Sequence, residues 1–409
     1  MNTAQKKAVL FVPFWRMAGH VGNHRIDRFR RWLSSDGYQI VVIRAGEKEG
    51  VCNEEWGIEI TVVDRLGLHP ESKPEQAIAV SKRKPSKLRR AVANWLFNPD
   101  PAVVWAKAAA RHPKVIEAVK GASLILSSSP PDSVHVGAWM LSEKTGVPMI
   151  MDMRDGWLDE PLKPLLNTSA FRRWREGRLE SRIAKHAKVI QVTSDVWKEL
   201  FDTRYPYLAA KVHVLTNGYP TQMPLQIRNA EREIKKEFIL IYAGQFTHSQ
   251  KARLPELLMA PLLKNLALKP SEGVIRFYGN LSNEEVECIQ SFEKQFMKIN
   301  WRIEFHGMVP RIEMLAAMQQ ADGLLLLSAS HAAIPSKLFE YLATELPIGY
   351  VAPQGSATDR VLKDFGNVVN LVSSRVGIFE LPTGKIPENY RERSLSRKFS
   401  EVLHFVFSE

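Results

Sequence analysis

The sequence predicts an α/β protein whose two domains face each other across a cleft. Short apolar runs, each suited to one buried strand, recur along the chain with helical patterns between them. The runs form two series, and a polar segment without core periodicity, residues 221–236, separates them. At 409 residues the chain also exceeds one typical hydrophobic core. We therefore expect two successive domains.

The first domain is placed at residues 1–219. Its apolar runs predict strands near residues 8–14, 39–43, 58–63, 123–128, 147–152 and 188–192. Between the third and fourth strands we expect a long irregular insert, residues 65–112.

The second domain is placed at residues 220–385, with strands near residues 238–244, 274–279, 302–307, 323–328, 347–352 and 367–372. A last helix near 390–407 carries one apolar face and predicts that residues 386–409 cross back to the first domain. Alternating strands and helices are typical of Rossmann-like domains, whose ligands bind beyond the carboxyl ends of the strands. In a chain of two such domains, the cleft between them is the expected ligand site.

The composition favours a cytosolic protein. No segment reaches the roughly 18 consecutive apolar residues of a membrane span. The first apolar run, residues 8–14, is too short for a signal-peptide core. Cys52 and Cys288 stand far apart and in no metal-ligand spacing, so neither a disulfide framework nor a metal site is expected.

Positive charge gathers in the first half. The net charge is +12, and residues 1–219 hold 34 Lys and Arg against 23 Asp and Glu. Residues 82–90 alone contain six basic residues and no acidic one, followed by Trp95 and Phe97. This stretch suits an anionic membrane face, with the aromatic rings in the interface. Nucleic acid binding and a solvated basic helix are the alternatives.

The stretch "IPSKLFEY" follows a buried strand and begins a helix. Backbone N–H groups there, the Ser336 hydroxyl and the Lys337 ammonium suit phosphate oxygens, whereas Glu340 suits a ribose diol. Together they predict a site for a nucleoside diphosphate. A helix start without any ligand explains the same residues equally well.

Other strand ends of the second domain support that site. Gly244 ends a strand and allows close backbone approach, and Lys251 and Arg253 in the next loop are placed to neutralise a diphosphate. In "FHGMVP", Gly307 and Val309 are placed to contact a base edge. Solvated loop cations and an ordinary strand-to-helix turn are the competing interpretations.

The first domain lacks the G-x-G-x-x-G spacing of dinucleotide binding after its first strand. Gly22, Asn23 and Arg25 in that loop remain candidates for contact with an acceptor or a phosphate.

The segment "DMRDGW" ends a buried strand in two carboxylates, Asp152 and Asp155, with Arg154 between them. This position suits general-base work on an acceptor hydroxyl, with Arg154 keeping one carboxylate ionised or oriented. The alternative is an Arg–Asp brace that shapes the loop.

As a whole the chain resembles bacterial glycosyltransferases of the GT-B fold, in particular glycosyltransferase family 4 of the polysaccharide and glycolipid type. The segments that carry the resemblance are "SSSPP", "DMRDGW", "TNGY", "YAGQF" with its following Lys and Arg, "FHGMVP", "ADGLLLL" and "IPSKLFEYLATELPI". The resemblance implies a nucleotide-activated sugar as donor, expected to be UDP-linked, with Lys337 on the diphosphate and Glu340 on the ribose. Gly244, Lys251 and Arg253 match the family's diphosphate contacts.

One position departs from the family. Many members carry a glutamate eight residues before the one that Glu340 matches, and here Ala332 stands there. Inversion with Asp155 or Asp152 as base and a retaining mechanism therefore both stay open. No D-x-D triplet offers metal ligands, and the family implies neither a bound metal nor another cofactor.

The expected function is sugar transfer to a hydroxyl of a lipid-linked or growing glycan in surface polysaccharide biosynthesis, by an enzyme bound peripherally at the cytoplasmic membrane face. A nucleotide-sugar epimerase of the same fold and a non-enzymatic nucleic-acid-binding protein are the alternatives. The latter needs base-stacking aromatics within the basic region.

Overall fold

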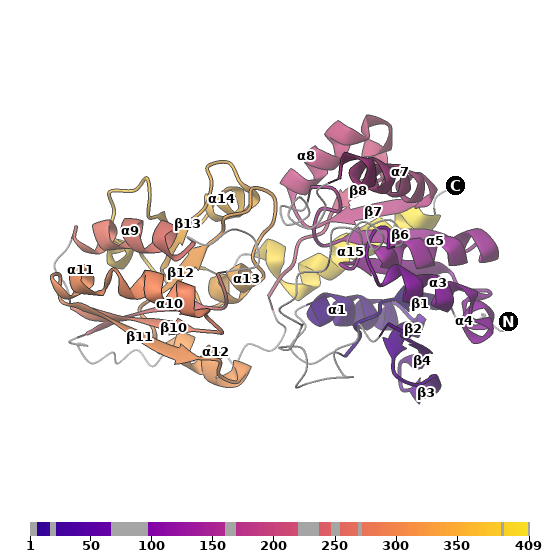
Figure 1. Cartoon of the computed structure of the whole chain (residues 1–409), viewed down its shortest axis with the longest axis horizontal. Coiled ribbons are helices and arrows are strands. Elements are labelled where there is room, and N and C mark those ends of the chain that lie inside the picture. Colours follow the sequence, from indigo (N-terminus) through magenta and orange to yellow (C-terminus); the bar gives the residue numbers. More distant parts are fainter. Residues whose placement is uncertain are drawn as a thin grey trace. The chain divides into compact units, whose positions relative to one another are not determined.

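The computed structural model describes residues 6–16, 22–66, 97–159, 169–219, 237–246, 254–268, 272–385 and 388–407 (Figure 1). It divides into two compact units. The first comprises residues 1–193, 197–215 and 396–409, and the second comprises residues 194–196 and 216–395. The basic stretch 82–90 and the expected linker 221–236 lie outside the described ranges.

The first unit is built on an eight-stranded sheet with the order β3-β4-β2-β1-β5-β6-β7-β8. The β3–β4 pair is antiparallel, and every other neighbouring pair is parallel. The strands are β1 (Lys7–Phe11), β2 (Gln39–Gly46), β3 (Gly50–Glu54), β4 (Gly57–Val63), β5 (Leu124–Ser129), β6 (Met149–Met153), β7 (Val189–Val192) and β8 (Val212–Val214).

Helices pack around this sheet, namely α1 (Gly22–Ser35), α3 (Val103–Arg111), α4 (Pro113–Val119), α5 (Ser133–Thr145), α7 (Ala170–His186), α8 (Asp195–Arg204) and a 3₁₀ helix (Pro206–Lys211). The irregular insert predicted over 65–112 is wrong for its last part, because α3 is helical there. Trp105 of α3 packs on Phe11 of β1, with ring centroids 5.0 Å apart, and this burial stabilises the helix.

The last helix, α15 (Glu392–Phe407), confirms the predicted return to the first domain (Figure 1). Phe399 of α15 packs against two rings of α1, Phe29 at 5.0 Å and Trp32 at 5.6 Å between centroids. The apolar face that the sequence shows at Leu395, Phe399, Val402, Leu403 and Val406 is buried throughout.

The second unit is built on a six-stranded, fully parallel sheet with the order β11-β10-β9-β12-β13-β14. Its strands are β9 (Phe238–Ala243), β10 (Gly273–Tyr278), β11 (Trp301–Gly307), β12 (Gly323–Leu327), β13 (Ile348–Val351) and β14 (Val368–Asn370). Its helices are α9 (Leu254–Leu266), α10 (Asn283–Gln290), α11 (Glu293–Met297), α12 (Arg311–Gln320), α13 (Lys337–Leu342), α14 (Ala357–Leu362) and two 3₁₀ turns (Ile378–Glu380 and Glu388–Tyr390).

Successive side chains of the central strands point to opposite faces of this sheet and pack into two hydrophobic cores, one on each face. Ile241 and Leu324 point to the face covered by α12 and α13. Tyr242 and Leu325, their neighbours in sequence, point to the face covered by α9, α10 and α11. The near-continuous apolar runs of the sequence therefore reflect strands that are buried on both sides.

Each sheet has one point where the strand order reverses. In the first sheet it lies between β1 and β5, and in the second between β9 and β12. At such a point the loops leave neighbouring strands in opposite directions and open a crevice at the carboxyl ends of the strands. The loops that follow β6 and β9, together with the start of α13 beyond β12, hold several of the residues discussed below.

Candidate functional site

Three neighbouring strands of the second sheet end in glycines with a positive φ angle. These are Gly244 after β9 (+102°), Gly279 after β10 (+135°) and Gly307 at the end of β11 (+65°). The Gly279 N–H donates to the Gly307 carbonyl at 2.8 Å. A Cβ on Gly279 would lie 2.6 Å from the Gly244 carbonyl oxygen. Because only glycine allows this approach, the strand ends form a backbone-lined edge without side chains.

Lys337, the first residue of α13, turns its ammonium group toward this edge. A Cβ built on Gly244 would lie 3.8 Å from Lys337 Nζ, which puts the two predicted residues side by side. Nζ is buried, and no described residue accepts a hydrogen bond from it. Burial lowers the pKa of Lys337 to about 7. The site thus holds a cation that lacks an anionic partner within the described chain.

Aromatic residues hold Lys337 in place. Its Nζ lies 3.8 Å from the centroid of the Tyr242 ring, within the range of a cation–π contact. Phe246 stacks on the same tyrosine, with centroids 4.2 Å apart and an interplanar angle of 5°. One turn into α13, the Tyr341 hydroxyl accepts a hydrogen bond of 2.9 Å from the Ala243 N–H. Helix and strand end are therefore joined beside the ammonium group.

The loop that leads from β12 into α13 is held by polar contacts. The Ser330 Oγ accepts from the Ala333 N–H at 2.9 Å, and the Ser194 Oγ donates to the Ala332 carbonyl at 2.7 Å. Ala332, which stands where the resembled family often has a glutamate, is 4% exposed. The small side chain is enclosed, so this loop offers no carboxylate at that position.

Glu340 is ion-paired in the structure. Arg311, the first residue of α12, donates from Nη2 to the Glu340 Oε1 at 2.7 Å. Ser336 is exposed, and its hydroxyl caps no backbone N–H of α13. Val309 packs, half-buried, against the core under α12 and α13. Lys251 and Arg253, the predicted diphosphate cations of the loop after β9, lie outside the described residues.

In the first domain, Asp152 at the carboxyl end of β6 forms a buried ion pair with Arg25 of α1. The Arg25 Nη2 donates to Oδ1 at 2.6 Å, and Nε donates to Oδ2 at 3.0 Å. The Ser128 hydroxyl donates to the same carboxylate at 2.6 Å. Asp152 is fully buried. The two side chains therefore pair with each other in the structure. Asp152 as base and Arg25 as an acceptor contact stay predictions.

Arg154 braces the neighbouring loop. Its guanidinium donates to the carbonyl of Ser129 and to that of Pro130, each at 2.7 Å. Its own carbonyl accepts from the Thr193 hydroxyl at 2.7 Å. Arg154 therefore fixes the "SSSPP" loop after β5 to the end of β6 through backbone carbonyls.

Asp155 differs from Asp152 in its surroundings. No described residue donates a hydrogen bond to its carboxylate, and burial raises its pKa, an effect that the charge of Arg154 only partly offsets. The side chain lines a small cavity of about 10 Å³ together with Asp159 and Trp197. A carboxyl with a raised pKa at a strand end has the properties of a proton acceptor.

Gly22 and Asn23 form the first turn of α1, where Gly22 is buried. Residues 17–21, which connect them to β1, lie outside the described ranges. Tyr242, Tyr341 and Ser128 are residues of the two sites that the sequence did not single out. Their aromatic and serine side chains stand in apolar runs or in a serine tract, where nothing distinguishes them from core residues.

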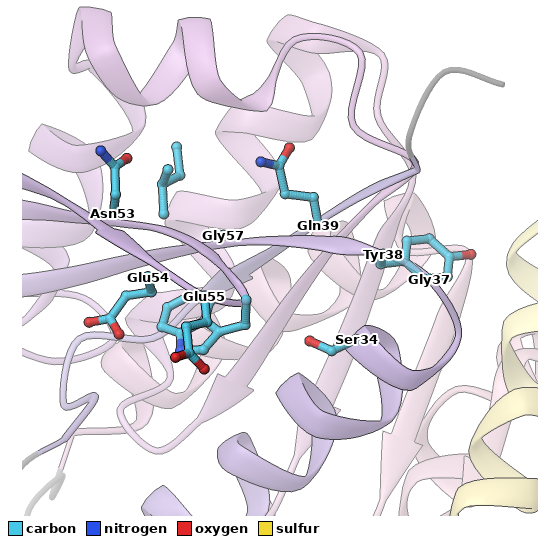
Figure 2. Close-up of a pocket in the computed structure, with 10 residues that line it drawn as sticks. Ser34, Gly37, Tyr38, Gln39, Asn53, Glu54, Glu55 and Gly57 are labelled. Carbon is cyan, nitrogen blue, oxygen red and sulfur yellow. The ribbon is translucent and has the colours of Figure 1, made fainter. Parts of the chain in front are cut away.

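A cavity of about 430 Å³ lies at the amino ends of β2 and β4, the edge of the first sheet opposite to Asp155 (Figure 2). Figure 2 shows Asn53 and Gln39 on one side of the sheet edge and Glu54, Glu55 and Ser34 on the other. These polar groups do not converge on one point, and none of the candidate site residues lines this cavity.

Within the described ranges, no group of three or more His, Cys, Asp or Glu side chains is arranged to hold a metal ion. Among the same residues, none of the helices combines the length and the apolar character that crossing a membrane requires.

Comparison with known proteins identifies the fold and the first domain. Residues 22–218 match the glycosyl transferase 4-like domain. A search of curated proteins finds no match. Among solved structures, sucrose-phosphate synthase from Thermosynechococcus elongatus is similar, with a TM-score of 0.58 and 13% identity over 99% of this chain and 95% of that one. A glycosyltransferase from Rickettsia africae gives a TM-score of 0.58 and 12% identity over 99% and 100%.

A third similar structure is Anabaena Alr3699/HepE in complex with UDP and glucose, with a TM-score of 0.51 and 12% identity over 97% of this chain and 99% of that one. These likenesses extend over both domains, although the identities are low. The chain therefore has the GT-B fold, and its residues 22–218 match the model of the glycosyl transferase 4-like domain.

Proposed function

We propose that this protein transfers a sugar from a nucleoside diphosphate sugar to a hydroxyl group. The observation that carries the proposal is the buried ammonium of Lys337, which lies against the Gly244 strand end without a described acceptor. A buried cation without a partner is costly and is retained where a ligand supplies the anion. A diphosphate fits the place, because Gly244 exposes backbone at the point where the order of the strands reverses.

The chemistry assigns different tasks to the two domains. The bond between the sugar anomeric carbon and the diphosphate oxygen breaks, and a bond from the acceptor oxygen to that carbon forms. Lys337 stabilises the negative charge that develops on the leaving diphosphate. Asp155, ionised above its raised pKa, is the group proposed to take the acceptor proton. This assignment corresponds to inversion by direct attack. A retaining mechanism in which Asp155 only positions the acceptor is the alternative.

Glu340 is the proposed ribose contact. Arg311 donates a hydrogen bond of 2.7 Å to its carboxylate. A carboxylate has enough lone pairs to accept hydrogen bonds from a ribose diol as well as from one arginine. Uracil is the proposed base. Its support is the similar structure of HepE, which was solved with UDP and with UDP and glucose.

The proposed acceptor is a lipid-linked or growing glycan of surface polysaccharide biosynthesis, bound by the first domain at the cytoplasmic membrane face. The support is the basic excess of residues 1–219, which suits an anionic membrane. Charge of this kind acts over about 10 Å at moderate salt, so we expect salt to weaken the association.

Titration calorimetry of the full chain with UDP, GDP, dTDP and CMP tests the donor site. We expect one nucleoside diphosphate to bind in about the micromolar range, and Lys337→Ala to weaken it about tenfold or more because a charge-assisted contact is lost. Lys298→Ala, an exposed lysine of the same domain, is the control. If no nucleotide binds, the donor site is refuted. Formation of an epimerised nucleotide sugar without acceptor would instead identify an epimerase.

A further inference from the structure

The outer face of α7 carries two large exposed aromatic residues. Phe171 is 59% exposed and Trp174 is 53% exposed. Their rings stack on each other, with centroids 5.8 Å apart and an interplanar angle of 24°. Exposed aromatic pairs of this size on a soluble surface indicate a contact with another molecule or with a lipid surface.

The same face is charged with one sign only. Both acidic residues of α7 are buried. Glu176 pairs with Arg172 at 2.9 Å, and Glu180 accepts from Tyr205 at 2.9 Å and from Arg204 at 3.1 Å. The basic residues on the helix side opposite to these buried residues are Arg175, Arg178, Arg182 and Lys185. The outer face of α7 therefore presents cations and aromatic rings, and no carboxylate of this helix offsets them.

The arrangement of the rings bears on which partner this surface binds, an anionic membrane or a single-stranded nucleic acid. The Arg178 guanidinium lies 4.5 Å from the Trp174 ring centroid, and Arg182 lies 5.1 Å from that of Trp139 in α5. Lys185 lies 5.0 Å from the ring of Tyr207, which is itself 60% exposed. A cation lies over each of these rings, so the basic and the aromatic side chains form one mixed surface. Ring edges flanked by arginines suit the headgroup region of a bilayer.

We propose that the outer face of α7, namely Phe171, Trp174, Arg175, Arg178, Arg182 and Lys185, is the surface by which the protein docks on an anionic membrane. The inference rests on the membrane association in the proposed function and assigns it to one helix. The arginines pair with lipid phosphates, and Phe171 and Trp174 enter the interface beside them.

The place of α7 in the chain agrees with this assignment. The Arg172 Nη2 donates to the Pro99 carbonyl at 2.5 Å, which fixes residues 97–100 beside the first turn of α7. In the sequence, Pro99 follows the basic stretch 82–90 by nine residues. The described residues that follow the basic stretch in the sequence are thus attached beside the first turn of α7.

The test is flotation of the full chain with vesicles of phosphatidylcholine, with and without about one third phosphatidylglycerol. We expect binding to the anionic vesicles only, and weaker binding at high salt. Arg178→Glu with Arg182→Glu should weaken binding at least about tenfold, since each cation near such a surface contributes appreciably. The matched control is Lys294→Glu in α11 with Lys298→Glu just after it, two exposed lysines of the second domain. It makes the same charge change and should leave binding nearly unchanged.

Brominated acyl chains provide a second readout that does not depend on charge. They should quench the tryptophan fluorescence of the bound parent, and Trp174→Phe should lose most of that quenching while it still binds. Calorimetry with UDP accompanies each variant, and unchanged UDP affinity shows that the variant is folded.

The outcomes separate the inference from the function on which it rests. If the parent does not bind anionic vesicles, the membrane association itself is wrong. If the parent binds and the α7 variant binds equally well, the docking surface lies elsewhere and this inference is wrong. Binding of a single-stranded oligonucleotide that depends on α7 would overturn it in favour of a nucleic acid partner.

Discussion

The ammonium group of Lys337 lies 3.8 Å from the centroid of the Tyr242 ring, and no described residue accepts a hydrogen bond from it. A π face satisfies a cation only in part. The pair therefore holds Lys337 in position while leaving its hydrogen-bonding capacity for a ligand. Four of the five predictions below concern this site.

The affinity for UDP should depend on the protonation of Lys337. Because the free lysine has a pKa lowered to about 7, it is charged below pH 7 and must take up a proton to pair with a diphosphate above that pH. The affinity should be full near pH 7 and fall by up to about tenfold per pH unit above it. Calorimetry in buffers of different ionisation enthalpy measures the proton uptake. If the UDP affinity of both the parent and Lys337→Ala is independent of pH between pH 7 and 9, protonation of Lys337 does not control binding.

Lys337→Met should stabilise the protein while removing UDP binding. A buried ammonium without a hydrogen-bond acceptor costs about 1–3 kcal/mol, and methionine fills a similar volume without that cost. The folded pKa lies below the unfolded one, so the unfolded state binds more protons between pH 7 and about 10. The parent thus gains stability as pH rises there, and the advantage of the variant should shrink. Urea unfolding at pH 7 and pH 9 measures both effects, and a destabilised variant would show that the lysine is structural.

Gly279→Ala should weaken UDP binding without changing any charge. The new Cβ would lie 2.6 Å from the Gly244 carbonyl oxygen, and the φ of +135° disfavours any side chain. The Gly244 turn must shift, and Lys337 with it. Gly355→Ala is the matched control, since its φ is +72° but its Cβ would point into open space. Equal losses of affinity in the two variants would mean that the close approach of the strand ends has no part in binding.

Substitution of Asp152 should lower the stability of the protein, whereas substitution of Asp155 should lower its turnover. Asp152→Ala leaves Arg25 buried without its carboxylate, which costs about 3–5 kcal/mol of unfolding free energy. Asp155→Asn removes a carboxylate that burial already disfavours, so stability should hold while turnover falls about a hundredfold or more. Urea unfolding and UDP release with acceptor present measure the two quantities. Unimpaired turnover of Asp155→Asn with unchanged UDP affinity would exclude Asp155 as the base.

Glu340→Ala should weaken the binding of UDP more than the binding of inorganic pyrophosphate. The diol of ribose loses its charged hydrogen-bond acceptor, an effect of about 1.5–3 kcal/mol, whereas pyrophosphate has no ribose. Arg311→Ala, which releases Glu340 from its ion pair, is the companion variant and should leave the pyrophosphate affinity similar. If Glu340→Ala weakens both ligands equally, Glu340 acts on the fold of the loop rather than on the sugar.

The fold could be predicted from the sequence because its strands are buried on both faces. Continuous apolar runs such as Gly323–Leu327 are stable only where both of their faces are buried. The order of these runs along the chain predicts the two sheets. Two strands escaped prediction. β3 is exposed over four of its five residues, and β8 has only three residues, so neither carries an apolar signal. The sequence does not mark α3 as a helix, because this segment adjoins the basic, proline-containing stretch.

The candidate site was predictable where topology alone brings residues together. Gly244 and Lys337 follow β9 and β12, which are neighbours in the sheet, so the carboxyl ends of these strands place them at one edge. The Arg25–Asp152 pair was not predictable in this way. The two residues are 127 positions apart, and their contact depends on how α1 lies over β6. Which of two carboxylates is paired is a matter of side-chain packing, which no motif encodes.

The packing of Phe399 on Phe29 and Trp32 bears on how the protein is synthesised. Residues 216–395 leave the ribosome between the bulk of the first domain and the segment that covers α1. Until translation reaches α15, the rings on that side of α1 lack their cover. A nascent chain that stalls within the second domain would expose them, and such a fragment would be a target for chaperones and proteases. Synthesis of the first domain is therefore complete only after the second has been translated.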